Sequence, residues 1–384
     1  MKIIKLSLIA AIAVSSMTVA SAQNLSDKSI KTLENLAETI EKINVSGTAV
    51  YRYNDYENSD AKDYYKIAAS VNSKVNNEIT FQSRIIVGDK TNPASFNTSS
   101  ESDSNVEITL SEMNFAYTGI EDSTITLGKQ AINTPFTVQR SSIGDEQLGT
   151  GLTGEKKFAD VIVGAGYFNT TNLKDSGHRK TDFTNNEAAN FTYVTAKTTL
   201  AGIKLDTAFS DVSDIFNMYT LGVSSNTTVS DIKLSTFARY SALDYDNTDA
   251  NHNLWKVGIK AKTGIFGAFL AYGETDEEGG NVGLDDGADT GFDEHWRVTL
   301  SGINDASTIY ASVNAQVSPK VNIALKYSDL SAGNASSDVD QNEIYLQLGH
   351  TMSSNLKSYI RLGQYDKDSS EKQTMGRLNI TYSF

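Results

Sequence analysis

The last eleven residues, Thr374 to Phe384, alternate between an apolar and a polar face. One face carries Gly376, Leu378, Ile380, Tyr382 and Phe384, and the other carries Met375, Arg377, Asn379, Thr381 and Ser383. Alternate side chains of a β-strand point to opposite faces, so one side of this segment is apolar and the other is wet. About ten residues of such alternation, closed by aromatic residues, are typical of a tilted strand that crosses a bilayer in an outer-membrane barrel. A soluble β-sandwich strand also alternates, and the rest of the chain has to distinguish the two.

The first 22 residues predict a cleaved secretory signal peptide. Two lysines precede an apolar run, and Ala20-Ser21-Ala22 forms a small-x-small cleavage site before Gln23. No other segment approaches the 18 consecutive apolar residues that a membrane-spanning helix needs. Only helices and closed barrels satisfy their backbone groups in lipid, so a membrane protein with this mean hydropathy of −0.32 has to be a barrel.

Composition narrows the chemistry further. The chain has no cysteine, which excludes disulfides, thiolate metal sites and a cysteine nucleophile. Its formal charge is −14, and loss of the two signal-peptide lysines leaves −16. Such an acidic chain argues against nucleic-acid partners, whose phosphates must be neutralised, and suits attraction of cations near a lipopolysaccharide surface. We therefore expect outer-membrane lipid and lipopolysaccharide as its surroundings.

Residues 23–44 predict a short amphipathic helix on the periplasmic side. Apolar side chains recur at helical spacing at Leu33, Leu36, Ile40 and Ile43, with charged residues between them. No linker divides the chain after this point. The expected organisation is therefore a signal peptide (1–22), this helix (23–44) and one barrel domain (45–384).

From residue 45 onward, the pattern predicts an all-β fold, a transmembrane antiparallel β-barrel of about 18 strands. Alternating segments occur at 46–53, 63–72, 77–87, 106–118, 122–129, 147–155, 159–168, 190–197, 202–210, 216–224, 231–241, 253–262, 265–273, 307–316, 320–329, 341–350, 355–365 and 374–384. Short and long connections then alternate, as expected for periplasmic turns and external loops. This alternation requires Trp296–Ile303 to lie in an extended external loop rather than in a strand.

Several short motifs resemble the major outer-membrane porins of Campylobacter and related bacteria. They are Val45-Ser46-Gly47 leading to Tyr51-Arg52-Tyr53, Leu127-Gly128-Lys129-Gln130 before a long loop, Gly149-Thr150-Gly151 after it, Ser318-Pro319-Lys320 in a turn, and the aromatic C-terminus. They follow the family's order across the mature chain, while the external loops are dissimilar. The resemblance implies an 18-stranded homotrimeric general porin whose third external loop folds into the lumen.

Alternation also predicts a basic ladder on the lumenal face. It comprises Arg52, Lys66, Arg84, Arg361 and Arg377, at similar heights on the first three and last two strands, which become neighbours when the barrel closes. Opposite them, the loop at 130–146 offers the constriction charges Asp145 and Glu146, with Arg140 nearby. Opposed charges across a pore would orient polar solutes and penalise apolar ones. The alternative is a set of scattered, solvated charges in a wide lumen.

An acidic run at 274–294 contains nine Asp or Glu residues and no basic residue. Carboxylates favour hard divalent cations, but no EF-hand frame is present. We therefore expect a solvated external loop, with weak calcium or magnesium binding as the alternative, and no other cofactor.

Two patterns that suggest an enzyme lack the context that such a site needs. Gly149–Gly154 satisfies G-x-G-x-x-G, but another strand follows where a nucleotide site needs a helix. The four histidines show no paired spacing, and His295 beside Asp293 and Glu294 is interpreted as an exposed loop residue. The sequence therefore predicts no enzyme but a porin of the bacterial outer membrane, for passive diffusion of ions and small hydrophilic solutes. The alternative is an adhesin that acts through its external loops.

Overall fold

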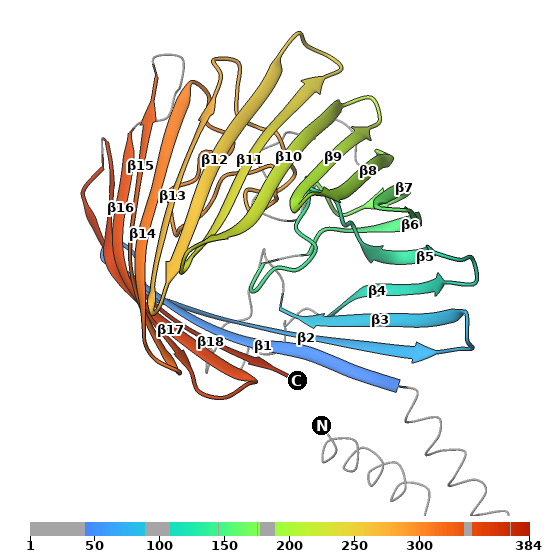
Figure 1. Cartoon of the computed structure of the whole chain (residues 1–384), viewed down its shortest axis with the longest axis horizontal. Helices are drawn as coiled ribbons and strands as arrows, with labels where there is room; N and C mark the ends of the chain where they lie inside the picture. The colour runs from blue at the N-terminus through green and yellow to red at the C-terminus, as the bar shows by residue number, and fades with distance from the viewer. Residues whose placement is uncertain are drawn as a thin grey trace, which may run out of the picture.

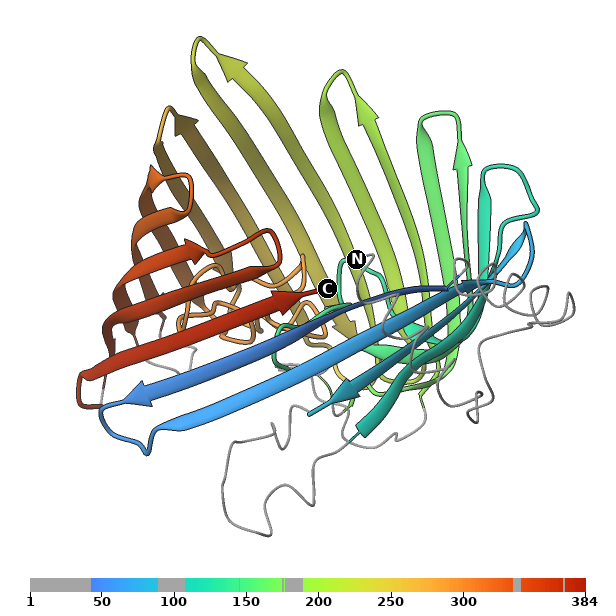
Figure 2. The ribbon, with the colours of Figure 1, turned by 90° about the horizontal axis from the view of Figure 1, so that it is seen from below.

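The computed structural model describes residues 43–88, 108–144, 146–174, 176, 189–333, 340–368 and 370–384. These residues form one antiparallel sheet closed into a ring, shown from two directions in Figures 1 and 2. Its strands are β1 (Ile43–Tyr56), β2 (Lys62–Lys74), β3 (Ile79–Val87), β4 (Ile108–Tyr117), β5 (Ser123–Ala131), β6 (Leu148–Phe158), β7 (Val161–Thr171), β8 (Phe191–Leu200), β9 (Ile203–Val212), β10 (Phe216–Val229), β11 (Ile232–Tyr245), β12 (Asn251–Thr263), β13 (Phe266–Thr275), β14 (Ala306–Ser318), β15 (Val321–Ala332), β16 (Gln341–Thr351), β17 (Leu356–Lys367) and β18 (Gln373–Ser383).

The ring closes where β1 pairs with β18, with Arg52 opposite Asn379. At its end, Gly47 and Phe384 exchange both backbone hydrogen bonds, at 2.9 and 3.0 Å. A Cβ at Gly47 would overlap the ring of Phe384, so this glycine lets the terminal aromatic ring lie against β1. The predicted fold class of an antiparallel barrel of about 18 strands is confirmed.

The two faces of each strand meet different surroundings. On β12, Trp255, Val257 and Ile259 point outward and are exposed, while Leu254 and Lys256 point inward and are buried. Exposed apolar side chains recur in this way around the ring, which gives the barrel an apolar outer surface. No helix in the described part of the chain is long and apolar enough to cross a membrane.

The connections at one end of the barrel are tight turns. Ala201 and Gly202 between β8 and β9 have φ of 50° and 83°, and Ser230 between β10 and β11 has φ of 54°. Positive φ matches the twist of a two-residue hairpin, which is why these connections are so short. At the other end, the connections between β3 and β4, β5 and β6, β7 and β8, and β13 and β14 are long, as expected, whereas only three residues join β9 to β10. Residues 1–42, and with them the predicted signal peptide and most of the predicted helix, lie outside the described residues, whereas Ile43 and Asn44 already belong to β1.

Two of the longer connections fold into the barrel (Figure 2). We call residues 132–147, between β5 and β6, loop L3, and residues 276–305, between β13 and β14, loop L7. Phe136 of L3 and Leu284 of L7 lie in one apolar cluster with wall residues such as Phe191. Phe292 and Leu300 of L7 lie in a second cluster. The infolded third loop was predicted and is confirmed, whereas the inward course of L7 was not foreseen.

Candidate functional site

L3 is tied to the barrel wall by the carboxylate of Glu146, whose side chain is fully buried. Arg84 of β3 donates to both of its oxygens, from Nε to Oε2 at 2.8 Å and from Nη2 to Oε1 at 2.6 Å. Lys66 of β2 lies 3.3 Å from Oε1 and also donates to the carbonyl oxygens of Ser141 and Gly144, at 2.9 and 2.8 Å. Charged groups lose their hydration when they are buried, so these bonds are what makes the arrangement stable.

Arg140 extends this network toward the lumen. Its guanidinium lies 2.6 Å from Glu112 of β4 and 3.3 Å from Glu146. Glu112 is the register partner of Arg84 in the pairing of β3 and β4. The carboxylates of Glu112 and Glu146 therefore lie close to both Arg84 and Arg140. Asp145, predicted beside Glu146, lies outside the described residues.

L3 and L7 are joined to each other by backbone hydrogen bonds. Leu284 N donates to Phe136 O at 2.8 Å, and Thr290 N donates to Pro135 O at 3.0 Å. The side-chain amide of Gln147 donates to Leu284 O at 2.7 Å. The two loops therefore form one partition across the lumen, and neither can move far without the other.

L7 is held to the wall by Glu343 of β16, four strands from β2 around the ring. This carboxylate is fully buried and accepts hydrogen bonds from the backbone N–H groups of Trp296 and Arg297, at 3.0 and 2.9 Å. The hydroxyl of Ser328 on β15 also donates to it, at 3.1 Å. Tyr310 of β14 places its hydroxyl 2.9 Å from Phe292 O and 2.8 Å from Val298 O. These contacts seat L7 against the wall.

Three of the predicted ladder arginines surround Trp296 or L3. Arg361 and Arg377 lie 5.6 and 5.1 Å from the Trp296 ring, within cation–π distance. Arg361 donates to the amide oxygen of Gln347 at 2.7 Å, and Arg377 donates to the amide oxygen of Asn54 at 2.7 Å and to the hydroxyl of Tyr56 at 3.2 Å. Arg52 donates to Asn379 at 3.0 Å and to Ser142 of L3 at 3.2 Å. These three guanidiniums are half-buried.

The five predicted ladder residues therefore fall into two groups. Lys66 and Arg84 form ion pairs with Glu146, whereas Arg52, Arg361 and Arg377 contact amides and aromatic rings. The sequence placed Glu146 across open water from the ladder, but the structure places it in direct contact with two ladder residues. We call β1, β2, β3, β17 and β18 the basic wall.

The acidic run is part of L7 and is not a solvated external loop. Val282, Leu284, Ala288 and Phe292 are buried, because apolar residues alternate with the carboxylates and pack against the wall. Within the described residues, which include all of L7, no three Asp, Glu or His side chains converge in a geometry that could hold a metal ion. The alternative of weak calcium or magnesium binding by this run is therefore not supported.

The surroundings shift the pKa values of two titratable groups of L7. Partial loss of hydration and the nearby carboxylates of Glu343 and Asp285 raise the pKa of Asp293 to about 7, although the residue keeps an exposed surface. Burial and the positive charges of Lys326 and Arg361 lower the pKa of His295 to about 3. His295 lies 2.6 Å from the Ser328 hydroxyl and is not the exposed loop residue that was expected.

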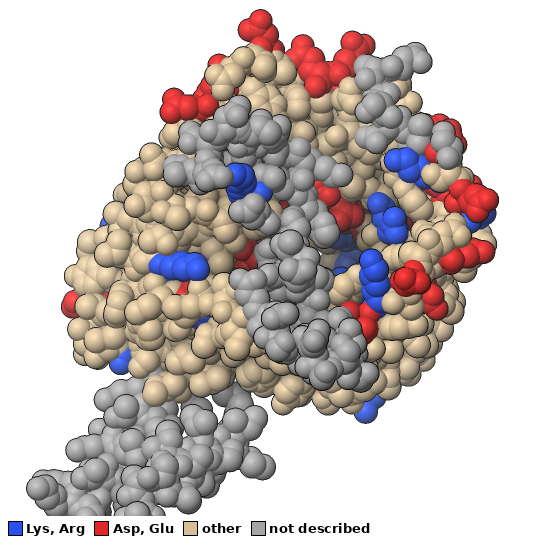
Figure 3. All heavy atoms as spheres, turned by 180° about the vertical axis from the view of Figure 1, so that it is seen from behind, with Lys and Arg blue, Asp and Glu red and all other residues tan. Residues whose placement is uncertain are grey.

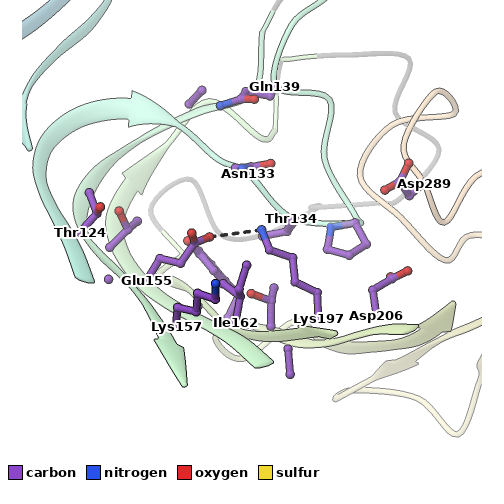
Figure 4. Close-up of a pocket in the computed structure, with 18 of the residues that line it drawn as sticks. Thr124, Asn133, Thr134, Gln139, Glu155, Lys157, Ile162, Lys197, Asp206 and Asp289 are labelled. Atoms are coloured by element: carbon purple, nitrogen blue, oxygen red, sulfur yellow. Dashed lines mark hydrogen bonds and ion pairs between the residues drawn. The ribbon is translucent and has the colours of Figure 1, made fainter. Parts of the chain in front are cut away.

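On the other side of L3, the described residues enclose a cavity of about 840 Å³. Strands β4 to β10, which we call the mixed wall, supply most of its lining, and Asn133 and Gln139 of L3 and Asp289 of L7 complete it (Figure 4). Glu155 and Lys197 form a pair at 3.3 Å and are each 54% exposed. Figure 3 shows acidic and basic side chains interspersed around the hollow of the barrel. The cavity therefore lies along the mixed wall.

The sequence analysis missed the residues that seat L7. Trp296, Arg297 and Tyr345 were not singled out, although Arg297 lies between the rings of Tyr56 and Tyr365, at 5.3 and 4.9 Å. The sequence does contain a signal for the inward course of L7. Apolar side chains recur through the acidic run, and a solvated loop does not need them. The segment Gly149–Gly154 lies within β6 and is followed by β7, as the rejection of a nucleotide site required.

Comparisons with known proteins agree with this architecture. The chain is similar to OpdK of Pseudomonas aeruginosa, solved with vanillate, at 12% identity and a TM-score of 0.73, covering 90% of this chain and 99% of that one. It is similar to OccK2 (OpdF) of the same organism, solved with glucuronate, at 12% identity and 0.73, covering 90% and 98%. It is also similar to OccAB4 of Acinetobacter baumannii, at 13% identity and 0.69, covering 89% and 97%. At these identities, the likeness shows the barrel fold. No family model and no curated protein matches the chain.

Proposed function

We propose that the chain is an outer-membrane porin, a water-filled channel for passive diffusion of ions and small hydrophilic solutes. The observation that carries this proposal is a barrel that is apolar outside and polar inside, with a lumen narrowed by L3 and L7 rather than filled. The fold shared with OpdK, described as an outer-membrane protein and solved with vanillate, supports it. A diffusion channel needs neither covalent chemistry nor a cofactor.

The export and assembly predictions belong to the same proposal. We propose that residues 1–22 are removed on export, that residues 23–44 lead into the barrel from the periplasm, and that three copies associate beside lipopolysaccharide. The element Leu127-Gly128-Lys129-Gln130 supports the finer resemblance to Campylobacter-type porins, because it ends β5 and leads directly into L3. Acidic composition gives no support to a nucleic-acid partner.

The adhesin alternative requires loops that project from the barrel. L7 is the longest connection that the structure describes in full, and it folds inward, so this observation favours a channel over a surface-binding protein.

Planar-bilayer recording of residues 23–384 tests the proposal. A water-filled pore gives long-lived conductance steps that scale with salt concentration. Silence from a folded barrel, identified by its changed gel mobility on heating, would contradict it and would direct attention to adhesion assays.

A further inference from the structure

The cavity along the mixed wall is rich in hydroxyl groups that have no partner among the described residues. Thr126 of β5, Thr195 of β8 and Ser224 of β10 all line it. Neither these side-chain hydroxyls nor those of Thr124 and Thr199 bond to any other residue that the structure describes. Neighbouring strands of a sheet lie about 4.8 Å apart, so these hydroxyls are spread across several strands of the wall, and a solute with several hydroxyls can exchange hydrogen bonds with the wall as it passes.

The charges on this wall compensate one another. Five acidic and four basic residues line the cavity, a net charge of −1. Glu155 lies 3.3 Å from Lys197, and Glu112 lies 2.6 Å from Arg140. Asp206 pairs at 2.7 Å with Arg239, which approaches from β11. Paired opposite charges leave little field beyond the screening length of about 8 Å, so this passage offers an anion no strong attraction.

Two of these ion pairs bridge strands that are not neighbours, and for one of them a glycine on the strand between makes room. Gly222 of β10 is the register partner of both Asp206 on β9 and Arg239 on β11. A Cβ at Gly222 would overlap both charged groups. The pair of Glu155 on β6 and Lys197 on β8 likewise spans β7, where Gly164 is the register partner of Glu155. Charge compensation is therefore built into the wall.

The basic side chains of the predicted ladder lie outside the cavity lining. Lys66 and Arg84 share the buried carboxylate of Glu146, and Arg361 and Arg377 lie against Trp296. We infer that the passage along the mixed wall selects uncharged, polyhydroxylated solutes of sugar size over anions of the same size. This inference rests on the proposed channel function and specifies its solute class.

Uptake of labelled glucose and labelled glucuronate by proteoliposomes tests the inference, because the two sugars share a ring and differ by one carboxylate. We expect glucose to enter about threefold faster or more, since a carboxylate gains no compensating charge in the passage.

Glu155→Gln leaves Lys197 uncompensated and should raise glucuronate uptake relative to glucose. Lys197→Gln should lower it, so the two variants must move the ratio in opposite directions. Asp249→Asn, in the exposed connection between β11 and β12, makes the same charge change as Glu155→Gln away from the cavity and should leave the ratio unchanged.

The outcomes separate the two proposals. Salt-dependent conductance with glucuronate uptake equal to or faster than glucose uptake would overturn the inference and leave the channel function standing. Failure of Glu155→Gln and Lys197→Gln to move the ratio in opposite directions would also overturn it. Absence of both conductance and uptake from the folded protein would contradict the channel function itself.

Discussion

The basic wall and the mixed wall of this barrel hold charged side chains in opposite ways. On the basic wall, Lys66 is 2% exposed and its partner Glu146 is 1% exposed, and the pair joins a strand to a loop. On the mixed wall, Glu155 and Lys197 are each 54% exposed and join strands to each other. A buried pair is costly to break, whereas an exposed pair contributes little to stability. The comparison teaches that the buried pairs of the basic wall hold the loops in place, whereas the exposed pairs of the mixed wall set the electric field along the passage.

Glu146→Gln should have the largest effect, because it removes the buried carboxylate that Lys66 and Arg84 share. Removal of one partner from a buried ion pair costs about 3–5 kcal/mol, so we expect L3 to leave the wall. Single-channel recordings should show a larger and noisier conductance, and the barrel should lose its heat resistance at a lower temperature. Glu155→Gln is the matched control and should leave both properties close to those of the native protein. Equal effects of the two substitutions would remove the distinction between the walls.

Trp296→Ala should have the second-largest effect. The indole contacts Arg361 and Arg377 and lies 5.3 Å from the ring of Tyr345. Loss of a buried tryptophan costs about 3 kcal/mol, and the vacated space would let L7 move. Trypsin should then cleave after Arg297 in intact barrels, as judged by mass spectrometry of the fragments. Trp255→Ala, on the outer face, is the control, and cleavage in both variants would show that barrel opening rather than L7 release is responsible.

A smaller effect is expected from Arg52→Gln combined with Arg377→Gln. The guanidiniums lie on the basic wall, outside the cavity lining, so screening with a length of about 8 Å reduces their field in the passage. The reversal potential in a salt gradient should shift modestly toward cations. A shift larger than that produced by Lys197→Gln would mean that the basic wall, not the mixed wall, sets selectivity.

The smallest expected effect is a pH dependence from Asp293. Its pKa is raised to about 7, so the side chain is mostly neutral at pH 6 and mostly charged at pH 8. Cation preference should therefore increase as the pH rises through 7, and Asp293→Asn should abolish this change. His295 should not contribute, because its lowered pKa of about 3 keeps it neutral throughout that range. Persistence of the change in Asp293→Asn would assign it to another group.

Most of the barrel could be predicted from period-two alternation, because a strand between lipid and lumen presents its two faces to different media. The course of L7 could not, because its carboxylates are a local signal for a solvated loop and its seat is formed by Glu343 and Tyr310, far away in sequence. The inward direction of Lys66 and Arg84 followed from alternation. Their pairing with Glu146 depends on where L3 turns back, which no local pattern specifies.

The central claim is that solutes pass along the mixed wall and not along the basic wall. The chain has no cysteine, so single cysteines can be introduced without interference. Thr195→Cys lies in the cavity lining, and Asn379→Cys lies on the basic wall, where the side chain is 4% exposed. We predict that a charged methanethiosulfonate reagent reduces the current through Thr195→Cys stepwise and leaves Asn379→Cys unaffected. Block of Asn379→Cys with no block of Thr195→Cys would contradict the account.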